Sequence, residues 1–149
     1  MSDGRCVVVQ AEDVPVFRAF GDEMRLTVPG KDTGGKYAQW LSITQPGGGP
    51  PPHLHEREDE WFYVLEGRVS FLVEGEWIEA GPGSGAFLPK GSVHTFKNAG
   101  DVPLHMVLTV APAGFEDFFA ESAAEFANAE RLDMAKILEI AGRYGIRFV

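Results

Sequence analysis

The chain has 149 residues, enough for one small domain that buries about two-thirds of the surface its unfolded form exposes. A hydrophobic fraction of 44% is typical of a globular protein rather than a disordered one. The formal net charge of −9 argues against binding to nucleic acid or to an anionic membrane surface, because both are themselves negatively charged.

The sequence carries one cysteine, Cys6, which excludes an intrachain disulfide and is compatible with a reducing cytoplasm, where we expect the protein to act. The apolar run that starts at Cys6 ends at Val9 and is too short for a signal-peptide core. No stretch approaches the roughly twenty apolar residues that cross a bilayer. No internal repeat is visible, so we expect residues 1–149 to form a single domain.

Short apolar segments alternate with turn signals from Tyr37 to Val110, which is typical of an all-β sandwich or barrel. Residues 25–28 near the N-terminus also have strand character. The pairs Glu66-Gly67 and Glu74-Gly75 each separate two such segments, and glycine allows the positive φ of a tight turn. We therefore expect a hairpin at each of these two junctions.

The periodicity becomes helical after residue 112. Phenylalanines recur at helical spacing in this region, at positions 115, 118, 119 and 126. A second amphipathic helix is predicted from about Arg131 to Tyr144, with Gly145 as its cap. We expect both helices, within residues 114–144, to pack on the outside of the β-structure, with the phenylalanines as a packing stripe.

Three histidines and a carboxylate form a candidate ligand set for a metal ion: His53, His55, His94 and an acid from the group Glu58, Asp59 and Glu60. Alternate residues of a strand share a face, so His53 and His55 point the same way, with Cα atoms roughly 6.6 Å apart. That spacing allows two imidazole nitrogens to reach one ion at about 2.0–2.1 Å.

Three neutral histidines and one carboxylate around a divalent ion leave about one net positive charge, which favours an anionic enolate or phenolate ligand. Positions left open on the metal would admit substrate, water or dioxygen. Such a centre can act as a Lewis acid, and the ligand carboxylate can also serve as a general base.

A pocket for a flat ligand is predicted around a set of mostly aromatic residues: Tyr37, Trp40, Phe62, Phe96 and Met106. We interpret Phe71 as ordinary core and the fourth histidine, His105, as a partly exposed strand residue. Asn98 and the glycines are interpreted as structural.

The spacing of these residues resembles the two-part signature of the cupin superfamily. The first part is Gly47, His53, His55, Glu60 and Gly67, and the second is Gly83, Pro89, Gly91, His94 and Asn98. The signature selects Glu60 as the ligand carboxylate, because only Glu60 lies seven residues before Gly67; Glu58 and Asp59 are then expected at a solvated loop edge. Further letters, including Trp40 and residues 59–67, are similar to small proteins described as quercetin 2,3-dioxygenase-like.

The resemblance implies a jelly-roll β-barrel over about residues 36–110, with one metal ion on His53, His55, Glu60 and His94. The ion could be iron, manganese, nickel, cobalt, copper or zinc. It also implies a homodimer with a swapped or paired terminal strand. Similar barrels serve oxygenases, isomerases, decarboxylases, polyketide cyclases and binding modules.

We therefore expect a metal-dependent enzyme, with a dioxygenase-like reaction on an aromatic or enolisable oxygenated small molecule and Glu60 as its catalytic base. The alternatives are a non-redox isomerase, lyase or polyketide cyclase, and a cupin that binds a small molecule without transforming it.

Overall fold

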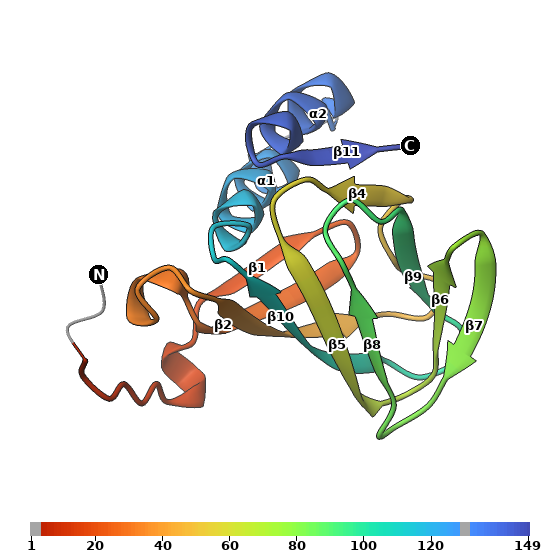
Figure 1. Cartoon of the computed structure of the whole chain (residues 1–149), viewed down its shortest axis with the longest axis horizontal. Coiled ribbons are helices and arrows are strands. Elements are labelled where there is room, and N and C mark those ends of the chain that lie inside the picture. Colours follow the sequence, from red (N-terminus) through yellow and green to blue (C-terminus); the bar gives the residue numbers. More distant parts are fainter. Residues whose placement is uncertain (1–3, 129–131) are drawn as a thin grey trace.

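The computed structural model describes residues 4–128 and 132–149, and these form two facing β-sheets with two helices at one end (Figure 1). The larger sheet runs, in spatial order, β1 (Val16–Ala19), β2 (Asp22–Val28), β3 (Ala38–Thr44), β10 (Leu104–Ala111), β5 (Asp59–Glu66) and β8 (Gly85–Leu88). The smaller sheet runs β11 (Ile146–Phe148), β4 (His53–His55), β9 (His94–Asn98), β6 (Val69–Val73) and β7 (Glu76–Ala80). The predicted jelly-roll fold is confirmed, with two separate sheets in the described residues rather than one continuous barrel.

The interior follows from strict alternation along the central strands. In β3 every second residue, beginning at Ala38, is buried, and the residues between them are half-buried. β10 continues this inner face with Leu104, Met106 and Leu108. Because side chains alternate across a strand, one face of each sheet is apolar and the two faces close on a common core. The strand predicted at residues 25–28 is confirmed as the end of β2.

One of the two expected hairpins is correct and the other is wrong. β6 and β7 pair directly around Glu74 and Gly75, whose φ values of 50° and 80° suit a two-residue turn. β5 and β6, however, belong to different sheets, so the chain crosses between the sheets at Gly67 instead of turning back. A Cβ on Gly67 would lie 3.0 Å from the Pro103 carbonyl oxygen, so this glycine allows a close backbone crossing.

The two C-terminal helices are α1 (Glu116–Asn128) and α2 (Met134–Arg143). The second was expected to begin near Arg131, which lies outside the described residues; the Asp133 side chain caps α2 by accepting a hydrogen bond from the Lys136 backbone N–H at 3.3 Å. Both helices lie at one end of the strands, beside β4 and β11 (Figure 1). Neither described helix has the length and apolar character needed to cross a bilayer.

The chain then returns to the smaller sheet as β11, a strand that the sequence did not suggest. β11 pairs with β4, placing Ile146 opposite His55 and Phe148 opposite His53. Two further backbone hydrogen bonds flank this pairing, from Glu56 N–H to the Gly145 carbonyl and from Val149 N–H to the Pro52 carbonyl. The C-terminus therefore supports the strand that carries two candidate ligands.

In the loop before β4, Gly49 lies close to the backbone of β9. Gly49 has a φ of 145°, and a Cβ there would lie 2.1 Å from the Phe96 carbonyl oxygen. We expect Gly49→Ala to lower the free energy of unfolding by about 3 kcal/mol or more, because the atoms it would meet, in Phe96 and Lys97, belong to the backbone and cannot move aside as a flexible side chain can. Gly47→Ala is the matched control: it has positive φ but open space, so about 1 kcal/mol is expected. Urea unfolding measures both, and equal losses would contradict the steric explanation.

Candidate metal centre

Three buried imidazoles converge between β4 and β9. His53 and His94 face each other in the register of the two strands, and their ring centroids are 4.7 Å apart. The His55 ring lies 5.1 Å from that of His53 and 5.6 Å from that of His94. One nitrogen from each ring lies within 4.8 Å of the others. The three histidines of the expected ligand set are thus brought together, and they could hold a metal ion.

Backbone carbonyls fix the orientation of two of these rings. His53 Nδ1 lies 2.8 Å from the Pro51 carbonyl oxygen, and His94 Nδ1 lies 3.0 Å from the Ser92 carbonyl oxygen. Since a carbonyl only accepts, both Nδ1 atoms carry the proton and donate it. This tautomer leaves the Nε2 lone pair of each ring available to a metal ion.

Glu60, on β5, brings a carboxylate oxygen to the same point. Its Oε2 lies 3.1 Å from His55 Nε2 and 3.5 Å from His94 Nε2, and the residue is only 4% exposed. Glu60 Oε2 and the Nε2 atoms of His55 and His94 are buried and have no hydrogen-bond partner. Buried polar atoms without partners are costly, and a shared metal ion would satisfy all three together. The residues therefore fit the divalent cation that the sequence predicted.

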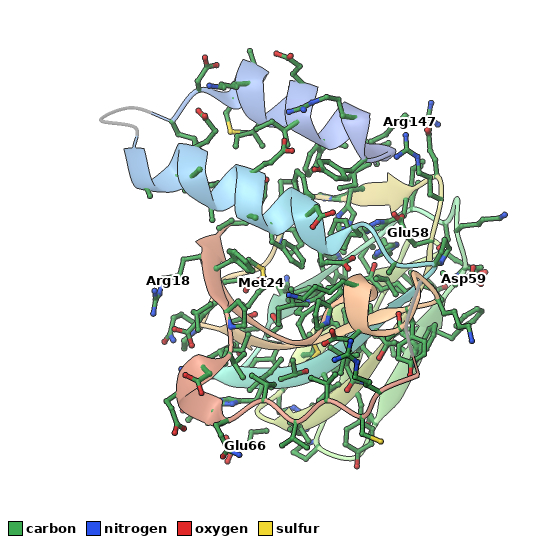
Figure 2. The ribbon with its side chains drawn as sticks, turned by 90° about the vertical axis from the view of Figure 1, so that its left-hand side faces the viewer. Arg18, Met24, Glu58, Asp59, Glu66 and Arg147 are labelled. Atoms are coloured by element: carbon green, nitrogen blue, oxygen red, sulfur yellow. The ribbon has the colours of Figure 1, made fainter. Side chains whose placement is uncertain are left out.

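A second carboxylate, Glu58, lies on the other side of His55. Glu58 was expected at a solvated loop edge, and this prediction is wrong: it is 4% exposed, and its Oε2 lies 3.3 Å from His55 Nδ1. Figure 2 shows Glu58 lying farther inside the molecule than Asp59. Asp59 is half-buried and accepts a hydrogen bond from the Lys90 backbone N–H at 3.0 Å. A carboxylate oxygen of Glu58 thus lies beside His55 Nδ1, where backbone carbonyls lie beside the Nδ1 atoms of the other two histidines, although the 3.3 Å contact does not have hydrogen-bond geometry.

The His55 ring lies between two carboxylates, Glu58 on its Nδ1 side and Glu60 on its Nε2 side. Burial acts against the charged imidazolium, but the carboxylates of Glu60 and Glu58 raise the pKa of His55 to about 9. Burial, together with the neighbouring imidazoles, lowers the pKa of His53 to about 4. Although burial raises it, His55 and His94 hold the pKa of Glu60 below its ordinary value. At neutral pH the metal-free site therefore carries its extra proton on His55.

A cavity of about 60 Å³ adjoins these residues. Trp40, Phe62 and Phe96, three of the five residues expected around a pocket, line it. Two predicted pocket residues do not. Tyr37 precedes β3 and is 45% exposed, because strand alternation turns Ala38 inward instead; Met106 is fully buried in the core.

The C-terminal segment supplies much of the remaining wall, a role that the sequence did not reveal. The residues are Phe115, Phe118, Phe119, Ile146 and Phe148. Phe115 packs edge-on against the His55 ring at 4.6 Å, and Phe119 packs against Trp40 at 4.9 Å. Three phenylalanines of the predicted stripe, one just before α1 and two within it, therefore pack against the cavity, while the fourth, Phe126, packs against Phe20. His105 is partly exposed, as expected, 3.6 Å from Glu66.

Comparison with known proteins agrees with this geometry. Residues 40–110 match the family model described as cupin domain. The matched segment, residues 40–110, is a cupin domain. A solved cupin-fold structure, the polyketide cyclase RemF from Streptomyces resistomycificus, superposes with a TM-score of 0.60 over 85% of this chain and 95% of that one. At 24% identity, this likeness shows the shared fold.

Two proteins with similar sequences are matched over very different shares of their own length. Polyketide synthase CurC from Streptomyces cyaneus is 28% identical over 106 residues, which cover 70% of this chain and 69% of CurC. Quercetin 2,3-dioxygenase from Bacillus subtilis is 31% identical over 100 residues, which cover 66% of this chain but 29% of the dioxygenase. The relatives therefore do not give the reaction of this chain.

Replacement of Glu58 should weaken metal binding without removing a ligand. We expect Glu58→Gln to lower the affinity for Co²⁺ or Zn²⁺ by about 10-fold to 100-fold, since it loosens the orientation of His55. The matched control is Glu56→Gln, two residues earlier, where an exposed glutamate pairs only with Arg147 at the surface. Competition titration against a chromogenic chelator measures both. Equal affinities in Glu58→Gln and Glu56→Gln would contradict the positioning role.

Metal uptake should release a proton. Because the pKa of His55 is raised to about 9, its Nε2 is protonated at pH 7 and must lose that proton to bind a metal. The apparent affinity should therefore rise about tenfold per pH unit between pH 6.5 and 8, and fall on acidification. Calorimetry in two buffers of different ionisation enthalpy should report about one proton released per metal. Release of no proton would contradict this assignment.

Proposed function

We propose that this cupin is a metal-dependent enzyme that acts on a small aromatic or enolisable oxygenated molecule, with a dioxygenase-type reaction. The supporting observation is the convergence of three imidazoles and the Glu60 carboxylate, all buried, on a cavity whose other walls are mostly apolar and aromatic. Such a cavity favours flat apolar molecules, while the polar end fixes their orientation.

His53, His55, His94 and Glu60 would hold the ion, with Nε2 atoms and a carboxylate oxygen as ligands. When bound, a divalent metal would supply Lewis acidity toward a substrate oxygen and, if it is redox-active, a means of reaction with dioxygen. Glu60 supplies the carboxylate at the ligand set, so it would act as general base toward a substrate hydroxyl only after its Oε2 leaves the ion.

The aromatic wall has two roles in this proposal. Phe115, against His55, and Phe119, against Trp40, offer ring faces and edges to a flat substrate. The same rings keep bulk water from the ligands, which strengthens electrostatic interactions inside the cavity. Substrate selection would therefore depend on α1 as well as on the strands.

A second candidate is a non-redox reaction, such as cyclisation or isomerisation, in which the metal acts only as a Lewis acid. The observation that favours it is the similarity to Polyketide synthase CurC, which extends over 69% of that protein, compared with 29% of the dioxygenase. The two candidates share the ligand set and differ in their need for oxygen and in the metals that support activity.

Oxygen dependence separates the two candidates. Protein loaded with Fe²⁺, Mn²⁺, Co²⁺, Ni²⁺, Cu²⁺ or Zn²⁺ would be incubated with quercetin and with small enolisable ketones, in air and under argon. We expect turnover in air with one dioxygen consumed per product, no turnover under argon, and no activity with Zn²⁺. Equal turnover under argon, or activity with Zn²⁺ alone, would contradict the oxygenase proposal and favour the second candidate.

The chain offers a matched pair of histidine variants for this assay. His94→Ala removes a candidate ligand and should reduce both metal content and turnover by about 100-fold or more. His105→Ala removes the histidine that lies on the surface beside Glu66 and should leave both unchanged. Retention of a small molecule by the metal-loaded protein with no product under any condition would indicate a binding protein instead of an enzyme.

A further inference from the structure

The cavity wall carries a second carboxylic acid besides Glu60, on a strand that contributes no metal ligand. Asp22 begins β2 and is 9% exposed, and it lines the same cavity as the three histidines and Glu60. Its neighbours on the inner face of β2, Met24 and Leu26, are both apolar. An acid in this row is costly to bury, so its presence at the cavity wall calls for a physical reason.

The strand register places Asp22 at the opposite end of the inner face from Glu60. Glu60 is in register with Val110, which is in register with Ala38 at the start of β3. Asp22 is in register with Thr44, at the end of β3. The Trp40 ring lies between these two levels and also lines the cavity. The cavity therefore has the ligand set as one polar region and the Asp22 region as another.

The hydrogen bond from Thr44 uses only part of the acceptor capacity of the Asp22 carboxylate. The Thr44 hydroxyl donates one hydrogen bond to Oδ1, whereas a carboxylate offers about four acceptor sites. Two arginines near Asp22, Arg18 on β1 and Arg25 on β2, do not pair with it: both pair with Glu23, on the opposite face of β2. Burial raises the pKa of Asp22 to about 6, and the Thr44 hydrogen bond only partly offsets this.

We propose that Asp22 is a second ligand anchor, which accepts a hydrogen bond from a hydroxyl group at the end of the substrate remote from the metal. This inference rests on the proposed function, since it requires a substrate held at the ligand set. It narrows the substrate class to small, mostly apolar molecules with two separated oxygen functions: a chelating enol or phenol at one end and a hydroxyl at the other. A site that hydrogen-bonds a hydroxyl discriminates strongly against the analogue that lacks it.

Matched ligand pairs test this proposal through binding rather than turnover. Kojic acid and allomaltol share one chelating group and differ only in a hydroxyl on the far side of the ring. 3,4′-Dihydroxyflavone and 3-hydroxyflavone form a longer pair that differs in the same way. Dissociation constants would be measured with Co²⁺-loaded protein under argon, from changes in the cobalt absorption spectrum. We expect at least one hydroxylated compound to bind about tenfold more tightly than its partner.

Variants of Asp22 should remove that preference while metal binding is retained. In Asp22→Ala the two members of the pair should bind within about twofold of each other, and in Asp22→Asn, a neutral acceptor of the same shape, the preference should fall to about threefold. Glu23→Ala, on the opposite face of the same strand, should keep the full preference. If Asp22→Ala does not fold, Asp22→Asn alone decides.

The proposal is overturned if both members of each pair bind wild-type protein equally well, or if the preference survives both Asp22 substitutions. A different result marks the failure of the proposed function: if none of the four compounds alters the cobalt spectrum of protein that has bound Co²⁺, the substrate does not occupy the metal, and both proposals fail together.

Discussion

The candidate centre depends on the pairing of two short strands from distant parts of the sequence. β4 has only three residues, and its register with β9 consists of the single pair His53 and His94. So small a contact cannot position two imidazoles alone, because isolated strand pairs are marginally stable. The other edge of β4 is held by β11 over three residue pairs, and the His55 carbonyl accepts a hydrogen bond from Gly91 N–H at 2.7 Å. The ligand geometry is therefore determined by three segments far apart in sequence.

The groups around the three histidines orient the rings toward a metal ion. Each Nδ1 faces an acceptor, and each of the three rings can present Nε2 to a common point. In the metal-free protein a protonated His55 compensates only one of the two carboxylate charges of Glu58 and Glu60, whereas a divalent ion compensates both. Metal binding therefore removes an uncompensated buried charge, which costs several kcal/mol. Pre-organisation of this kind is typical of histidine metal sites with carboxylate partners.

The sequence predicted the parts of the site that depend on local geometry. Strand alternation is a property of a few residues, so the common direction of His53 and His55 followed from their spacing, and the turn at residues 89–91 places His94 at the start of β9. Trp40 was proposed for the pocket as one of several aromatic residues; in the structure, alternation along β3 turns it inward. Tyr37 lies outside that strand, so alternation did not apply to it.

Other features depended on contacts between distant segments, which no local pattern encodes. Glu58 is buried because the loop after β4 folds back over His55, whereas its sequence neighbours, Glu56 and Asp59, made it look like part of a charged surface. The crossing at Gly67 looked like a hairpin because glycine serves both purposes. Nothing in Ile146–Phe148 itself indicated that this strand would pair with the ligand strand.

The position of β11 has a practical consequence for handling the protein. Val149 directly follows the strand that flanks the candidate ligands, so a polyhistidine tag fused there would start beside the metal centre and compete for its ion. Residues 4–13, before β1, lie on the surface, with Val7 and Val8 exposed, and at a distance from β4 (Figure 1). Purification tags and fluorescent labels are better attached at that end, and metal content is best measured after their removal.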